Sequence, residues 1–352
     1  MRAQGATNPD MFILARESRG LTQNDLKDMM DVTQGIISKV EQGFLRPSDD
    51  LIQSFSECLH YPRDFFFRIG YRLPPAAPFH RKRQALSRKL QSKIEAISNI
   101  RNLHILDLLD QIELTSSVLT VDPDDYKRNG PIEAAKAVRQ FWQLPRGPIN
   151  NLVSVVENAG IIIIYADVGT SLIDGFTFIT EMQHPVIYIN KNMQTDRIRL
   201  TIAHELGHIV MHKAPRPDME EEAYMFAGEF LAPSDEIGPY LDNISLDMLA
   251  RLKPYWKISM GAIIMRAKHL RKLNPDEERR LWAKMNYHGY KQCEPAQLDL
   301  PPEYPSLLND VIHYYLTDLG YSVKELCQLL TIQEDDFQDW YSPQIGGLRL
   351  VK

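Results

Sequence analysis

Residues 201–212 of this chain read TIAHELGHIVMH, which places a His-Glu-x-x-His pattern inside an apolar run. On a helix, His204 and His208 lie on one face about one turn apart, so both imidazoles reach one tetrahedral Zn2+. Glu205 is rotated by one residue and reaches a metal-bound water rather than the metal, which is the place of a catalytic base. Gly207 costs about 1 kcal/mol against Ala inside a helix, which predicts the close approach of a strand or substrate. The other interpretation is a buried amphipathic helix whose two histidines are hydrogen-bonded by neighbours.

A third protein ligand is expected downstream, in DMEEEAYMFAGEFLAP at residues 218–233. There, an apolar helical stripe is formed by Ala223, Phe226, Ala227 and Phe230. Glu222 flanks this stripe and is predicted to point inward as the third ligand, whereas Glu220 and Glu221 are predicted to face solvent. His212 is expected behind the site or at the surface. A set of two histidines and one glutamate predicts Zn2+, with Mn2+ as the alternative because such a set accepts several divalent ions.

The bulk composition bounds the class of protein. The chain has 352 residues, of which 44% are apolar and 24% charged, as in a soluble protein of two or three domains. We expect no membrane span and no secretory leader, because no apolar run is long enough and the N-terminus lacks an h-region. Three scattered cysteines favour a reducing cytoplasm. The net charge of −6 means that nucleic-acid binding has to come from a local patch.

A second motif lies near the N-terminus, in LTQNDLKDMMDVTQGIISKVEQGFLRPS at residues 21–48. Thr22 is a good N-cap with Asp25 at the N3 position, and Asp31 and Thr33 mark a turn before a second short helix. Two short helices joined by a tight turn predict a helix-turn-helix, while a small bundle that binds protein or only packs is the other interpretation. The residues predicted to contact DNA are Gln23, Gln34, Gly35, Ser38, Lys39 and Arg46, and the basic stretch from Arg81 is expected to add backbone charge.

Both motifs resemble known families. RIRLTIAHELGHIVMH followed by EEEAYMFAGEFLAPSDEI is similar to the ImmA/IrrE family of zinc metallopeptidases, with Tyr224 where that family usually has Asn. The resemblance implies a minimal zincin fold, in which His204, His208 and Glu222 bind zinc and Glu205 is the base. It also implies that HPVIYIN, residues 184–190, is the edge strand that pairs with substrate. The N-terminal segment resembles XRE-type helix-turn-helix proteins, from which Lys27 and Asp31 depart.

The predicted fold class is α+β and mostly helical, with four segments along the chain. Residues 1–70 form an all-α helix-turn-helix DNA-binding domain, and residues 71–130 a basic helical linker. Residues 131–300 form the zincin-like metallopeptidase domain with a small sheet. Residues 301–352 form a helical C-terminal module. In this last segment six positions echo the N-terminal motif at an offset of 300, but four acids would repel phosphate there, so we expect a protein contact or a coincidence rather than DNA binding.

These patterns predict a cytoplasmic transcriptional regulator with a zinc-dependent endopeptidase domain. The expected partners are a double-stranded DNA operator and a protein substrate, either repressor-like or a toxin or antitoxin, in a stress, mobile-element or toxin–antitoxin circuit. A homodimer is expected, because such DNA-binding modules read paired half-sites. The alternative is a non-catalytic regulator, or an antitoxin-like protein, whose zincin domain senses a signal or binds a partner.

Overall fold

The structure is a computed structural model that describes residues 6–73, 86–112, 114–121, 123–180, 184–213 and 216–345. Arg81 and the basic residues next to it lie outside these ranges. The chain divides into two compact units, the first made of residues 1–114, 178–183 and 306–352 and the second of residues 115–177 and 184–305. In the part that the structure describes, no helix is both long and apolar enough to span a membrane.

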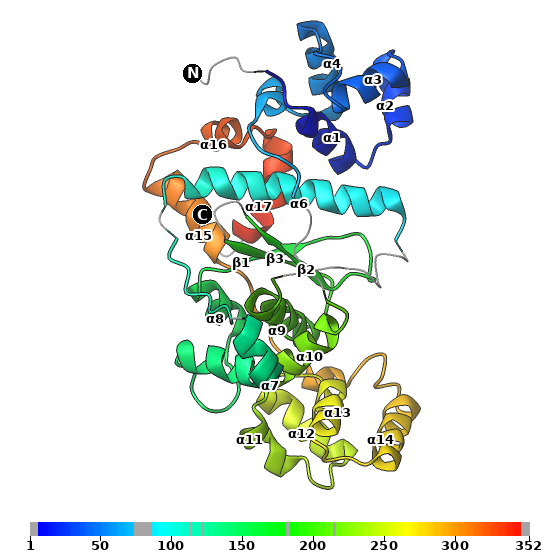
Figure 1. Cartoon of the computed structure of the whole chain (residues 1–352), viewed down its shortest axis with the longest axis vertical. Helices are drawn as coiled ribbons and strands as arrows, with labels where there is room; N and C mark the ends of the chain where they lie inside the picture. The colour runs from blue at the N-terminus through cyan, green and yellow to red at the C-terminus, as the bar shows by residue number, and fades with distance from the viewer. Residues whose placement is uncertain are drawn as a thin grey trace. The chain divides into compact units, whose positions relative to one another are not determined.

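The N-terminal domain of the first unit is a helix-turn-helix, as predicted (Figure 1). Thr22 and Asp25 form a reciprocal capping box at the start of the second helix. Asp31 ends that helix in the left-handed region with φ 52°, a conformation that Asp tolerates better than most residues. The elements are α1 (Pro9–Ser18), α2 (Gln23–Met30), α3 (Gln34–Glu41), α4 (Asp49–Leu59) and the 3-10 helix η1 (Arg63–Phe67).

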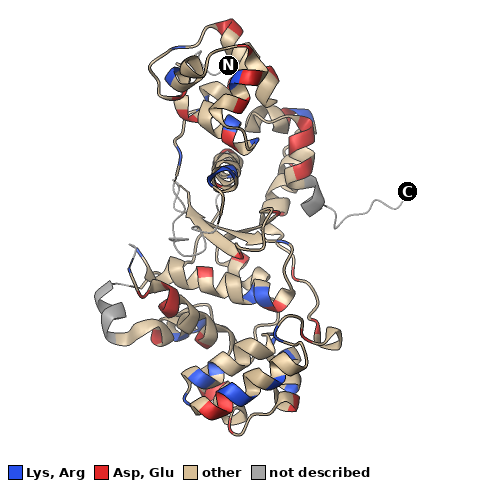
Figure 2. Ribbon diagram, turned by 90° about the vertical axis from the view of Figure 1, so that its right-hand side faces the viewer, with Lys and Arg blue, Asp and Glu red and all other residues tan. Residues whose placement is uncertain are grey.

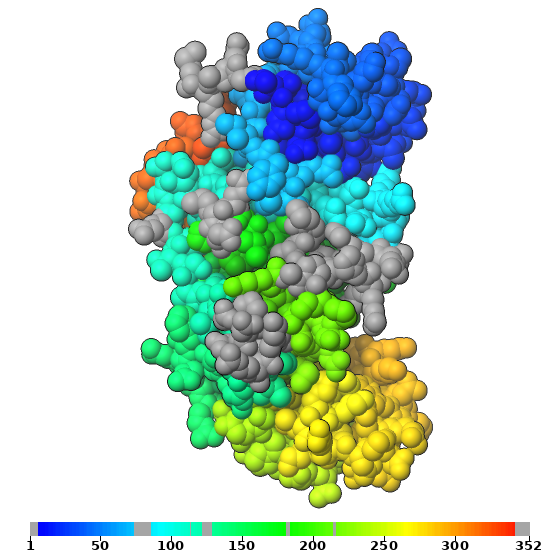
Figure 3. Space-filling view, viewed as in Figure 1, coloured from blue at the N-terminus to red at the C-terminus, as the bar shows by residue number. Residues whose placement is uncertain are grey.

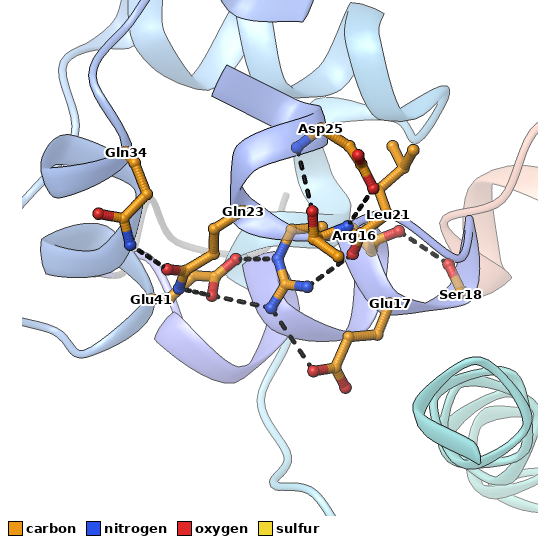
Figure 4. Close-up of polar contacts among 10 residues, drawn as sticks. Arg16, Glu17, Ser18, Leu21, Gln23, Asp25, Gln34 and Glu41 are labelled. Carbon is orange, nitrogen blue, oxygen red and sulfur yellow. Dashed lines mark hydrogen bonds and ion pairs between the residues drawn. The ribbon is translucent and has the colours of Figure 1, made fainter. Parts of the chain in front are cut away.

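A buried ion pair joins the first and third helices of this domain (Figure 4). Arg16 on α1 donates from Nε and Nη2 to the two carboxylate oxygens of Glu41 on α3, at 2.6 and 3.0 Å. The Arg16 side chain is 9% exposed and that of Glu41 is 3% exposed. Arg16 also donates to the carbonyl of Leu21, which starts the turn into α2. One guanidinium therefore ties α1 to both helices of the motif.

Replacing Glu41 by Gln should lower the free energy of unfolding of this domain by about 2 kcal/mol, because a charge-assisted hydrogen bond is lost and Arg16 stays buried. We expect amide hydrogen exchange in α1 and α3 of the full chain to accelerate roughly 30-fold. The matched control is Glu17→Gln, since Glu17 also contacts Arg16, at 3.5 Å and nearer the surface. Equal effects of the two variants would contradict a special role for the buried pair.

The rest of the first unit surrounds the long helix α6 (Arg88–Leu109). The C-terminal helices α15 (Leu307–Thr317), α16 (Val323–Leu330) and α17 (Glu334–Ile345) belong to this unit. Figure 3 shows the orange C-terminal residues directly against the cyan residues of α6. Arg68, just after η1, donates to the carbonyl of Leu330 at 3.0 Å, which joins sequence segments 262 residues apart.

A three-stranded sheet with strand order β1-β3-β2 is present among the described residues, and most of its residues belong to the second unit. The strands are β1 (Ile162–Ala166), β2 (Gly175–Ile179) and β3 (Pro185–Asn190), and β1 pairs in parallel with β3. All six residues of β3 are buried. The prediction that this segment is an edge strand is therefore wrong, because β1 and β2 flank it on its two sides.

Helices make up most of the second unit. Its core gathers side chains from the sheet and from several helices, with Trp256 as the largest of its fully buried side chains. Gly160 follows α8 with φ 84°, as expected of a C-cap glycine. The helical elements are α7 (Pro123–Phe141, kinked at Gly130), α8 (Leu152–Asn158), α9 (Thr195–Met211), α10 (Met219–Leu231), α11 (Ser234–Ile237), η2 (Gly238–Tyr240), α12 (Leu246–Trp256), α13 (Met260–His269), α14 (Pro275–Tyr287) and η3 (Ala296–Leu298).

Candidate metal centre and DNA-binding face

Two packed helices carry the candidate metal ligands. The His-Glu-x-x-His stretch lies on α9, and α10 packs along it. The helices approach closely at Gly207 on α9, because a Cβ there would stand 3.1 Å from the ring of Phe226 on α10. The prediction of a close contact at Gly207 is thus confirmed, but the neighbour is a helix rather than a strand or substrate. This approach brings the first turn of α10 beside the two histidines.

His204, His208 and Glu220 converge on one point. The Nε2 atoms of the two histidines are 3.0 Å apart. One carboxylate oxygen of Glu220 lies 3.5 Å from Nε2 of His204, and the other lies 3.4 Å from Nε2 of His208. Partial burial opposes ionisation of Glu220, but hydrogen bonds to the histidines and their charges outweigh it and hold its pKa well below the usual range.

This donor set fits a tetrahedral divalent ion. Ligand atoms about 2.0–2.1 Å from one tetrahedral Zn2+ stand roughly 3.3 Å apart. The two histidine nitrogens are 3.0 Å apart, and each lies 3.4 or 3.5 Å from one of the two carboxylate oxygens of Glu220. Two imidazole nitrogens and a carboxylate facing one another are stable only around a shared proton or a cation. Both histidines are buried, whereas the Glu220 side chain is 53% exposed, which leaves the open side toward solvent. Two nitrogens and one carboxylate are the set that catalytic zinc sites use.

Glu222, the predicted third ligand, is not among the three converging residues. Its carboxylate contacts Nε2 of His212 at 3.0 Å and Nη2 of Arg216 at 2.9 Å. The other ring nitrogen of His212 lies 2.8 Å from Nδ1 of His208, on the side of that ring away from Glu220. Burial and the neighbouring His208 lower the pKa of His212 to about 4. Glu222 and His212 therefore form a chain behind His208 of the kind that orients metal-binding histidines.

Glu205 is held by a residue that sequence reasoning missed. Thr177 on β2 donates from its hydroxyl to Oε2 of Glu205 at 2.7 Å. Thr177 is 1% exposed and Glu205 is 6% exposed, so the bond is shielded from water. It leaves the other oxygen, Oε1, available for proton transfer. The contact crosses 28 residues of sequence, and no local pattern in GFTFI indicates it.

In a chain that cleaves peptides with Glu205 as the base, replacing Thr177 by Val should reduce kcat about tenfold or more, because it removes the hydrogen bond that orients Glu205. KM and metal content should stay unchanged, since Thr177 is buried and its hydroxyl bonds Glu205 rather than a candidate metal ligand. Thr177→Ser keeps the hydroxyl and should retain most of the activity. An unaltered kcat in the Val variant would show that Glu205 needs no such support.

The predicted DNA-contacting residues lie in the N-terminal domain, and most of them are exposed. Gln34, Gly35, Lys39 and Arg46 are exposed, and Ser38 is half-buried on the same helix as the first three. Gln34 donates to Oε1 of Gln23 at 2.6 Å, and Gln23 donates to Glu41 at 2.7 Å (Figure 4). The buried Arg16–Glu41 pair therefore anchors a row of two glutamines that ends at the exposed face of α3. Such pre-oriented amides suit recognition of adenine in the major groove.

Fold and sites together define a DNA-binding chain that also carries a metallopeptidase-type domain. Comparison with known families agrees: residues 13–66 match the family described as helix-turn-helix, and residues 156–268 match the family described as IrrE N-terminal-like domain. The chain is thus a fusion of an XRE-type helix-turn-helix domain with a domain of the ImmA/IrrE metallopeptidase type, as its motifs predict. No curated protein matches the chain.

Proposed function

We propose that the chain is a DNA-binding regulator whose second unit is a zinc-dependent endopeptidase acting on a protein partner. The observation that carries the proposal is the convergence of His204, His208 and Glu220, with Glu205 held beside them by Thr177. We propose Glu220 as the third ligand in place of Glu222. The regulatory half rests on the helix-turn-helix domain. A repressor-like protein, or a toxin or antitoxin, remains our proposed substrate class, with Mn2+ as the alternative ion.

In the proposed mechanism each residue of the candidate metal centre has a role. Zn2+ bound by the three ligands would polarise a peptide carbonyl and acidify water. Glu205 takes the proton of the attacking water and passes it to the departing amine, and Thr177 keeps its carboxylate in place. His212 and Glu222 hold the ring of His208 in one orientation. The exposed Glu220 leaves room on the solvent side for an extended peptide.

The peptidase activity is tested with a complex mixture of substrates, because the partner is unidentified. Purified full-length chain is incubated with Zn2+ and a cell lysate that has not been digested with trypsin. New N-terminal amines are then identified by mass spectrometry. We expect a small set of cleavage sites that disappears when a chelator is added and returns with Zn2+. A set of new termini that is the same with and without chelator would contradict a metal-dependent peptidase.

Sequence-specific DNA binding by the helix-turn-helix domain is tested with the variant Gln34→Ala. Loss of a base-reading amide should weaken binding to sequences selected from a random duplex pool about tenfold, with little change for unselected DNA. Lys39→Ala is the matched control, since a phosphate contact should weaken binding to all sequences equally and reduce the salt slope by about 1. Binding to paired half-sites would need two copies of the chain, and we propose a homodimer on DNA. Equal binding of selected and unselected DNA by the wild type would contradict sequence-specific readout.

A further inference from the structure

The C-terminal helices repeat the helix-turn-helix of the N-terminal domain. At an offset of 300, α15, α16 and α17 correspond to α1, α2 and α3, and the second and third helices of both sets begin at matching positions. Thr22 with Asp25 and Ser322 with Glu325 form the same capping box. The faint echo of six positions in the sequence thus corresponds to a shared cap and matching helix starts in the structure.

The backbone conformations of the two turns also agree. Gly20 and Gly320, which precede the second helix of each set, have φ 68° and 70°. Asp31 and Thr331, which end that helix, both have φ 52°. Left-handed conformations are uncommon for residues other than glycine, so their recurrence at matching positions argues against coincidence. Core positions correspond too, in the buried pairs Phe12 and Ile312, Leu26 and Leu326, and Ile37 and Phe337.

The second copy lacks the side chains that are predicted to contact DNA in the first. Where α3 carries Gln34, Gly35 and Lys39, α17 carries Glu334, Asp335 and Asp339 at the matching positions. Figure 2 marks acidic residues in red along the helix that leads into the C-terminus. Carboxylates at these positions would repel the phosphates that flank a major groove. Two of the acidic side chains at the start of α17 instead contact the N-terminal domain, which belongs to the same unit.

Arg19 and His60 of the N-terminal domain bind the start of α17. Arg19 donates from both terminal nitrogens to the carboxylate of Asp336, with one contact at 2.7 Å. Nε2 of His60 lies 2.9 Å from Asp335. Arg19 is itself held by the carbonyls of Leu59 and His60 at the end of α4, so its guanidinium is already oriented.

Two further arginines bind the backbone of the repeated motif. Arg68 donates to the carbonyl of Leu330, at the C-terminal end of α16, and to the hydroxyl of Thr331. A cation at that position complements the partial negative charge of a helix C-terminus. Arg101 on α6 donates to the carbonyl of Trp340 and lies over the ring of Tyr341. The side chains of these two arginines therefore bind the turn after α16 and the C-terminal half of α17.

We propose that residues 307–341 are a second helix-turn-helix that has exchanged DNA readout for intramolecular docking. Its partner is the arginine face of the N-terminal domain and α6, formed by Arg19, Arg68 and Arg101 with His60. Each chain then presents a single DNA-reading helix-turn-helix, and the acidic copy packs against the domain that carries it. This inference is independent of the peptidase activity.

The docking is tested by hydrogen exchange of the full-length chain with the double variant Asp335→Asn, Asp336→Asn. Loss of two charge-assisted contacts should accelerate exchange in α16 and α17 about tenfold or more, with the second unit unchanged. The matched control is Glu334→Gln, Asp339→Asn, which removes the same charge from the same helix and should leave exchange unchanged. Equal exchange in the wild type and both variants, or equal acceleration in both variants, would overturn the proposed contacts.

Two further readouts separate the alternatives. Protection of α16 and α17 should not change on dilution, and a loss on dilution would mean that the copy docks on a second chain instead. Binding to a mixed-sequence DNA duplex should change less than twofold in the Glu334→Gln, Asp339→Asn variant, because the copy does not face DNA. A severalfold gain in affinity in that variant would show that the acidic helix lies at the DNA interface and would overturn the proposal.

Discussion

Glu205→Gln should abolish measurable peptide cleavage, with a fall in kcat of about a thousandfold or more. The amide is close in shape to the carboxylate and can still accept the hydrogen bond from Thr177. It cannot take a proton from water at neutral pH, and removal of a general base costs about 10²–10⁴ in rate. The measurement is the appearance of the new N-termini that the wild type produces in the lysate assay, followed over time.

The same variant separates an enzyme from a non-catalytic regulator. Metal content and DNA binding should match the wild type, because Glu205 is not among the converging ligand atoms and lies outside the helix-turn-helix domain. If a cellular phenotype of the chain survives Glu205→Gln, the metal site serves a sensor or binding role instead. Cleavage at the wild-type rate by the variant would contradict the assignment of the base.

Glu220→Ala should reduce Zn2+ affinity at least a hundredfold, whereas Glu222→Ala should reduce it about tenfold. Glu220 supplies a carboxylate directly to the ligand cluster, so its loss leaves two histidines. Glu222 acts through His212 on the far nitrogen of His208, and such supporting contacts change metal affinity about 10–100-fold when they are lost. The dissociation constants are measured by competition with a chromogenic chelator.

The two variants form a matched pair, since both remove one carboxylate from the first turn of α10. The reverse order of effects would restore Glu222 as the ligand and contradict the placement of Glu220. Similar losses of more than a hundredfold in both would mean that the chain from Glu222 through His212 is as necessary as the ligand itself.

The sequence predicts well those features that local chemistry determines. Thr22, Asp25 and Asp31 define caps and a turn within ten residues of one another, and the structure has both at these positions. The spacing of His204 and His208 likewise places both rings on one helix face. The families that these motifs resemble match the corresponding segments.

Features that depend on tertiary packing are not predictable from the same patterns. Glu222 is the more buried of the two glutamates, with 22% of its side chain exposed against 53% for Glu220, as the apolar stripe of α10 predicts. Which of the two glutamates meets the histidines depends on how α10 is rotated about its axis where Phe226 packs on Gly207 of α9. The strand order is another such feature, because β3 follows β2 in sequence yet lies between β1 and β2. The contact of Thr177 with Glu205 depends in turn on that order.

The most direct test of the central claim is the metal content of wild-type protein purified without chelator, measured by elemental mass spectrometry beside His204→Ala. We expect close to one Zn2+ per chain in the wild type, or Mn2+ in its place, and almost none in the variant. A wild-type chain that holds no divalent metal even after Zn2+ is supplied would contradict the peptidase proposal and leave a DNA-binding regulator with an inert zincin-like domain.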